Sequence, residues 1–368
     1  MPPLFLPHDR LQGLLDELTG RGYQVVGPLV KEGAVVLAPL KEAAQLPWGV
    51  RTVQTPGSYT LQEGDPARAF EWVIGPSSLK PFLFKQTETL WQTTLDAEGR
   101  PQFESVVESR AQAVIGVSPC DLVAMRVQDR VFLEGENVDI RYQARREALF
   151  TVVVNCTRVA DTCFCVSQGG SPRADRGYDL AVTEIDGGLV IEAGSAVGEE
   201  VLGALALAPA TAAQTQVADA GIDRAAGSQR RRTPPRELLA KVLPEAKDHP
   251  QWDVIAERCE SCGNCTKLCP TCICHKQMYL PSLDGEGGEQ VREWASCHSE
   301  AHSHVSGKSQ RDQRRERYRM WVTHKFANME EQFDSPGCVG CGRCVAWCTN
   351  GIDLTENLKA VVGGQSDE

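Results

Sequence analysis

Long hydrophobic runs are missing from this sequence, histidine is scarce, and positive charge is outweighed by negative charge. The start, MPPLFLPHDR, has no basic segment ahead of an apolar one, which argues against a secretory signal. No apolar run reaches the roughly 18 residues of a membrane span, since the best candidate, residues 201–213, contains Gly203 and Pro209. The 38 Lys and Arg residues face 49 Asp and Glu residues, a net charge of −11, which argues against a nucleic-acid partner. We therefore expect a cytoplasmic protein that contacts neither membrane nor nucleic acid.

Two nucleotide-binding motifs are also missing. No G-x-G-x-x-G stretch follows a predicted strand, so there is no dinucleotide fingerprint. The stretch SGKS at residues 306–309 is similar to the end of a phosphate-binding loop. Such a loop needs a glycine five residues before Gly307, and that position is His302.

Cysteine, in contrast, is abundant, with 15 copies in 368 residues. An odd number cannot all pair as disulfides, and thiols outside the secretory route stay reduced. Reduced thiols that cluster bind metal or carry out redox chemistry. Four of them lie between residues 120 and 165, and the other eleven lie between Cys259 and Cys348.

The predicted fold class is α+β, with two domains. Pro234 and Pro235 would break any helix, so we place the boundary there and expect domains at residues 1–235 and 236–368. The first should be an α/β domain and the second a mainly helical, ferredoxin-like domain.

The first domain should contain a parallel βαβ unit. Residues 113–117 and 150–155 are short apolar runs typical of strands buried on both faces. The segment between them, residues 120–133, has a helical pattern with Asp121 as the expected N-cap. A hairpin should follow, with its turn at residues 186–188.

In the second domain, a helix with Pro250 in its first turn should end at Cys259. Apolar residues at helical spacing further on indicate core packing rather than a cofactor contact. They are Tyr318, Trp321, Val322, Phe326 and Met329.

Two cysteine runs carry the chemistry, each with the spacing C-x2-C-x2-C-x3-C that holds a 4Fe–4S cluster. Small residues such as Gly263 and Gly342 let the backbone approach the sulfides. The fourth cysteine of such a run normally binds the other cluster. The predicted ligands are Cys259, Cys262, Cys265 and Cys348 for cluster 1, and Cys338, Cys341, Cys344 and Cys269 for cluster 2. Zinc is the alternative, since C-x2-C pairs also form zinc knuckles.

Four further thiols could hold a third 4Fe–4S cluster. Cys120 and Cys156 each directly follow a predicted parallel strand, and such strand ends open onto one edge of the sheet. Cys163 and Cys165 lie a few residues beyond. The alternative is that these are buried small residues and a loop.

The remaining cysteines and histidines give weaker signals. Cys272, Cys274 and Cys297 could be packing residues, a redox-active pair or part of a further site, and we favour structural roles. Three histidines close together could bind a metal, but such a short polar segment is more often a solvent-exposed loop. They are His298, His302 and His304. His275 could donate a hydrogen bond to a cluster. The Arg-rich stretch at residues 311–319 could contact RNA, but on an acidic chain a solvated helix face or a docking surface is favoured.

Several stretches together resemble the iron–sulfur β subunit of soluble NiFe hydrogenases (sulfhydrogenases) and the related A subunit of anaerobic sulfite reductase. They run from about residue 75 to residue 356. The C-terminal stretches are CESCGNCTKLCPTCIC, REWASC, RYRMWVTHKF and GCVGCGRCVAWC followed by GIDLTE. The N-terminal stretches are LKPFLFKQTETL, GVSPCDL, VNCTRVADTCFC and GYDLAVTEIDGG.

This resemblance implies a subunit that carries electrons and catalyses no bond chemistry itself. Its clusters would connect a flavin subunit, which exchanges electrons with NAD(P), to a catalytic partner. That partner would be the NiFe small and large subunits in a hydrogenase, or a sirohaem subunit in a sulfite reductase. The eight cysteine positions given above match the family motif.

The sequence departs from the family in two places. Thr349-Asn350 stands where the family commonly has Pro-Val, which could loosen the loop after Cys348. Residues 296–317 are also more polar and richer in histidine, so partner contacts could differ there.

Overall fold

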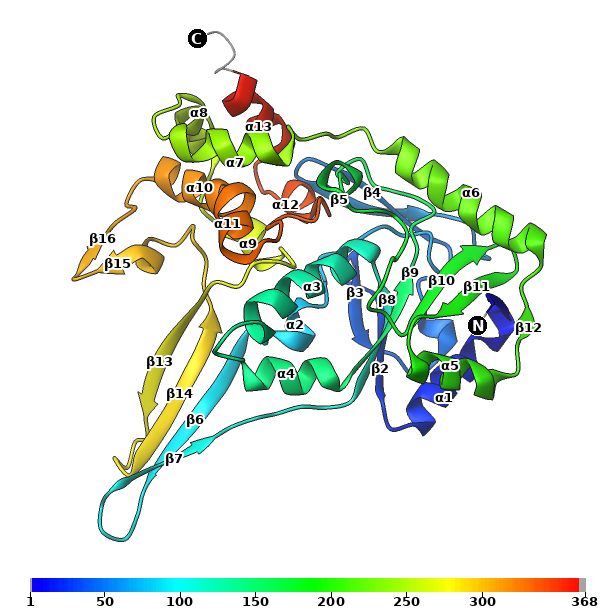
Figure 1. The fold of residues 1–368 in the computed structure, drawn as a ribbon, viewed down its shortest axis with the longest axis horizontal. Helices are drawn as coiled ribbons and strands as arrows, with labels where there is room; N and C mark the ends of the chain where they lie inside the picture. The colour runs from blue at the N-terminus through cyan, green and yellow to red at the C-terminus, as the bar shows by residue number, and fades with distance from the viewer. Residues whose placement is uncertain (1, 364–368) are drawn as a thin grey trace.

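A mixed eight-stranded β-sheet forms the centre of the computed structural model, which describes residues 2–363 (Figure 1). The strand order is β12-β1-β11-β10-β9-β8-β2-β3, in which the neighbours β2, β8, β9 and β10 run parallel and the other pairs antiparallel. The strands are β1 (Leu4–Pro7), β2 (Gln24–Lys31), β3 (Ala34–Pro39), β8 (Gln112–Val117), β9 (Leu149–Val154), β10 (Leu180–Ile185), β11 (Gly188–Ala193) and β12 (Ala208–Pro209).

The predicted parallel unit is confirmed as β8, α3 (Pro119–Leu133) and β9, with Ala113 opposite Phe150 in the ladder. The N-cap differs from the prediction. Ser118 caps the helix by accepting a hydrogen bond from the Asp121 amide, because Pro119 suits the first helical position. Asp121 therefore lies inside the first turn, where its carboxylate accepts a hydrogen bond from the Ser118 hydroxyl at 3.0 Å. The predicted hairpin is confirmed as β10–β11.

Both faces of the sheet are buried, which explains the continuous apolar runs of its central strands. Neighbouring residues alternate between two cores: Val152 belongs to one and Val153 to the other. The first core includes α1 (Leu11–Gly20) and α5 (Ala196–Leu205). The second includes α3 and α4 (Ile140–Glu147), on the opposite side (Figure 1).

The C-terminal region is a group of helices around its own core, reached through α6 (Ala212–Ser228). Its helices are α7 (Arg236–Glu245), α8 (Gln251–Arg258), α9 (Asn264–Lys267), α10 (Arg314–Thr323), a π-helical turn (His324–Asn328), α11 (Met329–Phe333), α12 (Arg343–Ala346) and α13 (Leu354–Gly363). The predicted helix ending at Cys259 is α8. The predicted apolar stripe is buried, so it packs in the core as expected.

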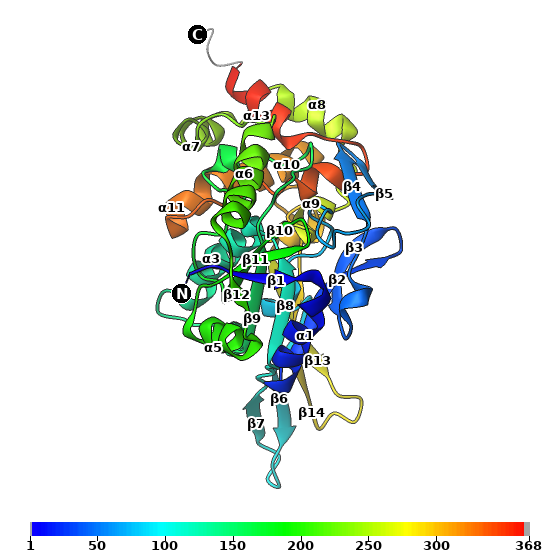
Figure 2. The same cartoon turned by 90° about the vertical axis from the view of Figure 1, so that its right-hand side faces the viewer.

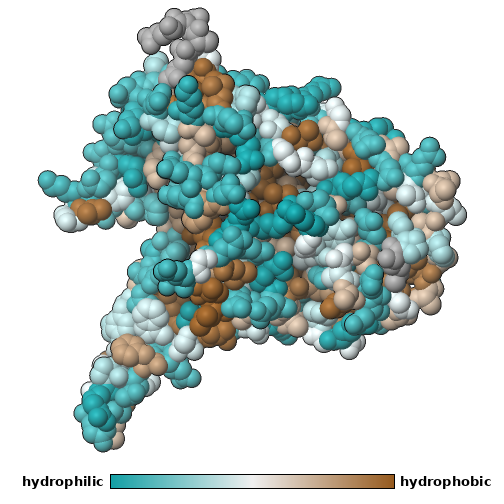
Figure 3. Space-filling view, viewed as in Figure 1, coloured by the Kyte–Doolittle hydropathy of each residue, from teal (hydrophilic) through white to brown (hydrophobic). Residues whose placement is uncertain are grey.

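A long four-stranded arm projects from the body (Figures 1 and 3). Its order is β13-β14-β6-β7, formed by β13 (His275–Pro281), β14 (Gly287–Trp294), β6 (Thr87–Leu95) and β7 (Pro101–Ser105). Figure 2 shows the arm and the helical region at opposite ends of the molecule. Because the arm takes strands from both sides of residue 235, the two halves share a sheet, and the C-terminal half contributes a hairpin that the sequence analysis did not predict.

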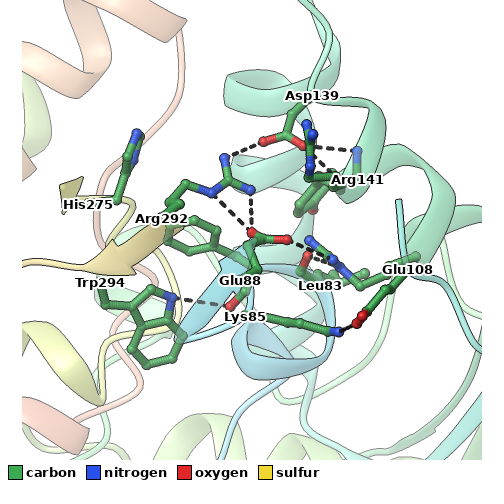
Figure 4. Close-up of polar contacts among 12 residues, drawn as sticks. Leu83, Lys85, Glu88, Glu108, Asp139, Arg141, His275, Arg292 and Trp294 are labelled. Carbon is green, nitrogen blue, oxygen red and sulfur yellow. Dashed lines mark hydrogen bonds and ion pairs between the residues drawn. The ribbon is translucent and has the colours of Figure 1, made fainter. Parts of the chain in front are cut away.

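A buried charge network fixes the arm to the body (Figure 4). Glu88 of β6 accepts hydrogen bonds from Arg145 of α4 and from Arg292 of β14, at 3.0 Å each. Arg292 also reaches Asp139, the N-cap of α4. Removal of one member of such a buried group leaves uncompensated charge, so these contacts orient the arm firmly.

The other elements are short. They are α2 (Lys80–Leu83), the hairpins β4 (Val50–Thr55) with β5 (Ser58–Glu63) and β15 (His304–Val305) with β16 (Lys308–Ser309), and 3-10 turns at His8–Arg10, Ala43–Gln45, Val166–Gln168 and Glu300–Ser303. Within residues 2–363, none of the helices is long and apolar enough to cross a membrane.

Candidate metal centres

The first cysteine run forms a tight loop between α8 and α9. Cys259 caps the C-terminus of α8, and the chain turns through Ser261 and Gly263, whose φ angles are 55° and 79°. Cys265 lies in the short α9 that follows. A Cβ on Gly263 would lie 3.2 Å from the Ser296 hydroxyl oxygen, so glycine suits both the backbone conformation and the packing.

The second run repeats this design. Gly340 and Gly342 have φ angles of 65° and 77°, and Cys344 lies in the short α12. A Cβ on Gly342 would lie only 2.2 Å from the carbonyl oxygen of Thr162. The second loop is therefore pressed against the segment after β9, which carries Cys163.

The last cysteine of the second run lies near the first loop. A pocket with about 460 Å³ of empty space is lined by Cys259, Cys262, Cys265, Cys344 and Cys348. We call the set Cys259, Cys262, Cys265 and Cys348 site 1. Its Cys262 is exposed, and the other three thiols are partly or fully buried.

The last cysteine of the first run lies in turn beside the second run, because the Lys325 ammonium donates both to the Cys269 sulfur and to the carbonyl of Gly337, the residue before Cys338. Burial raises the pKa of the Cys338, Cys341 and Cys344 thiols, and the charge of the Cys269 thiolate raises each of them further. We call this set of four, Cys338, Cys341, Cys344 and Cys269, site 2.

The donor chemistry of both sites fits a 4Fe–4S cluster, which takes four cysteine thiolates. Within residues 2–363, no three His, Cys, Asp or Glu side chains are grouped so that they could hold a single metal ion. A zinc ion would need its ligands within about 2.0–2.3 Å of one point. Four cysteine thiolates at each site match the number and kind of ligands of a 4Fe–4S cubane.

The four N-terminal thiols are also brought together. Cys120 starts α3 directly after β8, and Cys156 follows β9, so both lie at the carboxyl edge of the parallel strands. They line one small cavity with Cys163, Cys165 and Cys341. We call the set Cys120, Cys156, Cys163 and Cys165 site 3. Gln229 of the α6 C-terminus donates a hydrogen bond to the Cys165 sulfur at 3.0 Å.

Sites 2 and 3 share a wall. The Phe164 amide donates to the Gly340 carbonyl at 2.8 Å, and a Cβ on Gly340 would lie 2.6 Å from the Cys165 backbone nitrogen. Arg343, next to the second loop, forms a two-point ion pair with Asp121 of α3, with both distances 2.7 Å.

Two buried lysines lie beside site 2, and the sequence analysis singled out neither. The Lys325 ammonium donates to the Cys269 sulfur at 3.2 Å and to the Gly337 carbonyl at 2.7 Å. Burial lowers the pKa of Lys325, but the Cys269 and Cys272 thiolates outweigh that effect and hold it above its ordinary value. Lys80 donates to the Lys267 carbonyl at 2.8 Å and lies over the Trp294 ring.

His298 is a buried neighbour of site 1 that the sequence analysis placed wrongly. Expected in a solvent loop, it is 2% exposed, and its Nε2 lies 3.2 Å from the Cys265 sulfur. Burial lowers the pKa of His298 to about 4, with the Arg317 charge adding to the effect. Its position directly after Cys297, the last residue of the family-like stretch REWASC, was the available signal. His304 of the same group is exposed.

Several weaker expectations meet different outcomes. His275 hydrogen-bonds the Ile273 carbonyl rather than a thiol. Arg317, in the Arg-rich stretch, is buried and donates to the Asp312 carbonyl at 2.6 Å, so this part of the stretch is structural. The segment after Cys348 lacks proline but is held by two hydrogen bonds. The Arg258 side chain donates to the Asn350 carbonyl, and the Asn350 side chain donates to the Arg258 carbonyl.

Comparison with known proteins agrees with this geometry. Residues 258–352 match a family described as a 4Fe–4S dicluster domain, and this segment contains sites 1 and 2 in full. The chain is also 28% identical over 256 residues to sulfhydrogenase 2 subunit beta of Pyrococcus furiosus, which covers 68% of this chain and 74% of that protein. No solved structure shows significant similarity to the chain.

These matches support an iron–sulfur electron-transfer subunit that is similar to a sulfhydrogenase beta subunit. The resemblance drawn from the sequence is confirmed, and it points to an oxidoreductase complex as the setting. The dicluster match supports 4Fe–4S clusters as cofactors.

Proposed function

We propose that the chain is the electron-transfer subunit of a cytoplasmic, NAD(P)-linked NiFe hydrogenase complex. It would relay electrons between a flavin subunit and the small and large hydrogenase subunits, without catalysing bond chemistry itself. Sites 1, 2 and 3 would each hold one 4Fe–4S cluster. Bound there, such a cluster supplies one-electron transfer, with a potential set by burial and by hydrogen bonds to sulfur.

One observation supports this most: the three thiol sets form a continuous row. Cys344 of site 2 also lines the pocket of site 1, and Cys341 of site 2 also lines the cavity of site 3. Each end of the row approaches the surface, through the exposed Cys262 at site 1 and the half-buried Cys156 at site 3. A relay between two partners needs such an entry and exit.

The surrounding residues hold the thiols and exclude water. Tyr318 and Trp321 of α10 form an apolar wall of site 1, and both are buried. Lys325 places a positive charge against Cys269, which offsets the negative charge of four thiolates. Both effects favour electron transfer over loss of the cluster to solvent.

Iron and acid-labile sulfide per chain test the proposal, measured on anaerobically purified material. We expect about twelve irons, four for each cluster. Cys163→Ser should reduce this to about eight, whereas Cys274→Ser, outside all three sites, should leave it unchanged. About eight irons in both wild type and Cys163→Ser would remove site 3, and zinc without iron would overturn the whole assignment.

A second experiment tests the relay and its terminus. Cys341→Ser should abolish hydrogen-dependent reduction of NAD(P) while the complex still reduces artificial dyes. Unchanged transfer would contradict the role of site 2. Nickel in the purified complex would support the hydrogenase, and sirohaem in its place would assign the chain to a sulfite reductase.

A further inference from the structure

The base of the arm holds two thiols that none of the three sites uses. Cys274 directly precedes β13, and Cys297 follows the end of β14 by three residues. The ladder joins these segments: His275 pairs with Trp294, and the Ala295 amide donates to the Cys274 carbonyl at 2.9 Å. Figure 4 shows His275 and Trp294 at this end of the hairpin. The Cys274 and Cys297 thiols are hydrogen-bonded to each other.

The two thiols have different surroundings. Cys274 is half-buried and also hydrogen-bonds His302, with His324 nearby, whereas Cys297 is buried. The hydrogen bond from Cys297, followed by those contacts with His302 and His324, holds the pKa of Cys274 below its ordinary value. Cys274 is thus the nucleophile and Cys297 the resolving thiol.

His302, which contacts Cys274, lines an open cleft with about 1230 Å³ of empty space. His275 and Ser296, the chain neighbours of the two cysteines, line it as well, so the pair lies one residue behind the cleft wall. Lys267 and Lys276 line the same cleft, as does the exposed Cys262 of site 1. No Asp or Glu is among its lining residues. Lys276 forms an ion pair with Glu293 at 3.0 Å, so Lys267 carries the positive charge that suits a small anionic ligand.

We propose that Cys274 and Cys297 form a redox-active dithiol that reduces a small anionic disulfide in this cleft. The Cys274 thiolate attacks one sulfur of the disulfide, the S–S bond breaks, and one thiolate leaves. Cys297 loses its proton and attacks the mixed disulfide at the Cys274 sulfur, which releases the second thiolate. The external disulfide gains two electrons, and its two thiolates take up one proton from Cys297 and one from solvent, while the pair becomes a Cys274–Cys297 disulfide.

Renewal of the dithiol takes two electrons and two protons. Only this renewal rests on the proposed function, because its electron source would be site 1. The connection is short: His298 follows Cys297 in the chain and contacts the Cys265 sulfur at 3.2 Å.

The test is a single turnover on the full chain, purified anaerobically in its reduced state and mixed with glutathione disulfide, which carries carboxylates. We expect release of two glutathione molecules per chain and a Cys274–Cys297 cross-link in acid-quenched, alkylated peptides. Cys297→Ser should stop halfway, with one glutathione released and one attached to Cys274. The matched control Cys272→Ser should still form the cross-link. The positively charged disulfide cystamine should react at least about tenfold more slowly.

Two results would overturn the proposal: no cross-link in the wild-type chain, or full release of two glutathione molecules by Cys297→Ser. Iron measured in the same samples separates this test from the proposed function, because the exchange itself needs no cluster. If Cys297→Ser loses iron, the wild-type chain still decides. A low dose of iodoacetamide should then alkylate Cys274 before Cys297, and equal labelling would contradict their assigned roles.

Discussion

The Arg343 guanidinium meets the Asp121 carboxylate through two 2.7 Å contacts, and the two side chains are only 2% and 4% exposed. Asp121 lies in the first turn of α3, one residue after Cys120, and Arg343 directly precedes Cys344. The pair therefore joins the site 3 helix to the site 2 loop. Arg343 also donates to the carbonyls of Gly75 and Ser77, so it locks three segments together.

Loss of one partner of this pair should destabilise the protein strongly. Asp121→Ala leaves the Arg343 charge buried and unpaired, and we expect a loss of about 3–5 kcal/mol in the free energy of unfolding. Urea denaturation of the anaerobic protein measures it. The control Asp175→Ala removes the exposed partner of Arg126 and should cost at most about 1 kcal/mol. Equal losses in the two variants would contradict the clamping role of Asp121.

The Lys325 charge should set the potential of the cluster at site 2. The Lys325 ammonium lies 3.2 Å from the Cys269 sulfur, and a unit charge this close to the site is worth roughly 2–4 kcal/mol in an effective dielectric of about 20. Lys325→Met should therefore lower the site 2 potential by about 100 mV. A redox titration followed by electron paramagnetic resonance measures this shift. Lys359→Met, at a surface ion pair on α13, should leave the potential unchanged. An unshifted potential in Lys325→Met would contradict the role of Lys325.

The sequence predicted best those elements and ligands that are marked by patterns of residues close together in the chain. Apolar runs fixed the expectation of β8 and β9, and cysteine spacing alone predicted that Cys348 crosses to the first loop. The arm escaped prediction because β14 pairs with β6 across about two hundred residues, and neither strand has a strong apolar alternation. Lys325 gave no signal for the same reason: its contact with Cys269 arises from tertiary packing of the π-helical turn against the cysteine loop.

Gly342 should tolerate no side chain. Its φ of 77° disfavours other residues, and a Cβ would lie 2.2 Å from the Thr162 carbonyl oxygen. Gly342→Ala should separate the second loop from the site 3 segment and lower iron content at both sites. The control Gly203→Ala lies in α5 with open space around it and should stabilise the protein by about 0.5–1 kcal/mol. Iron and sulfide analysis of both variants checks this, and full iron in Gly342→Ala would refute it.

His298 should tune site 1 through its contact with Cys265. Hydrogen bonds to cluster sulfur raise the reduction potential because they stabilise the more negative reduced state. With its pKa lowered to about 4, His298 is neutral near pH 7 and offers one N–H donor. His298→Phe keeps the aromatic contact with Trp321 but removes that donor, so the site 1 potential should fall. His304→Phe, on the exposed β15, is the control. A titration that finds the same site 1 potential in both variants would show that His298 serves packing alone.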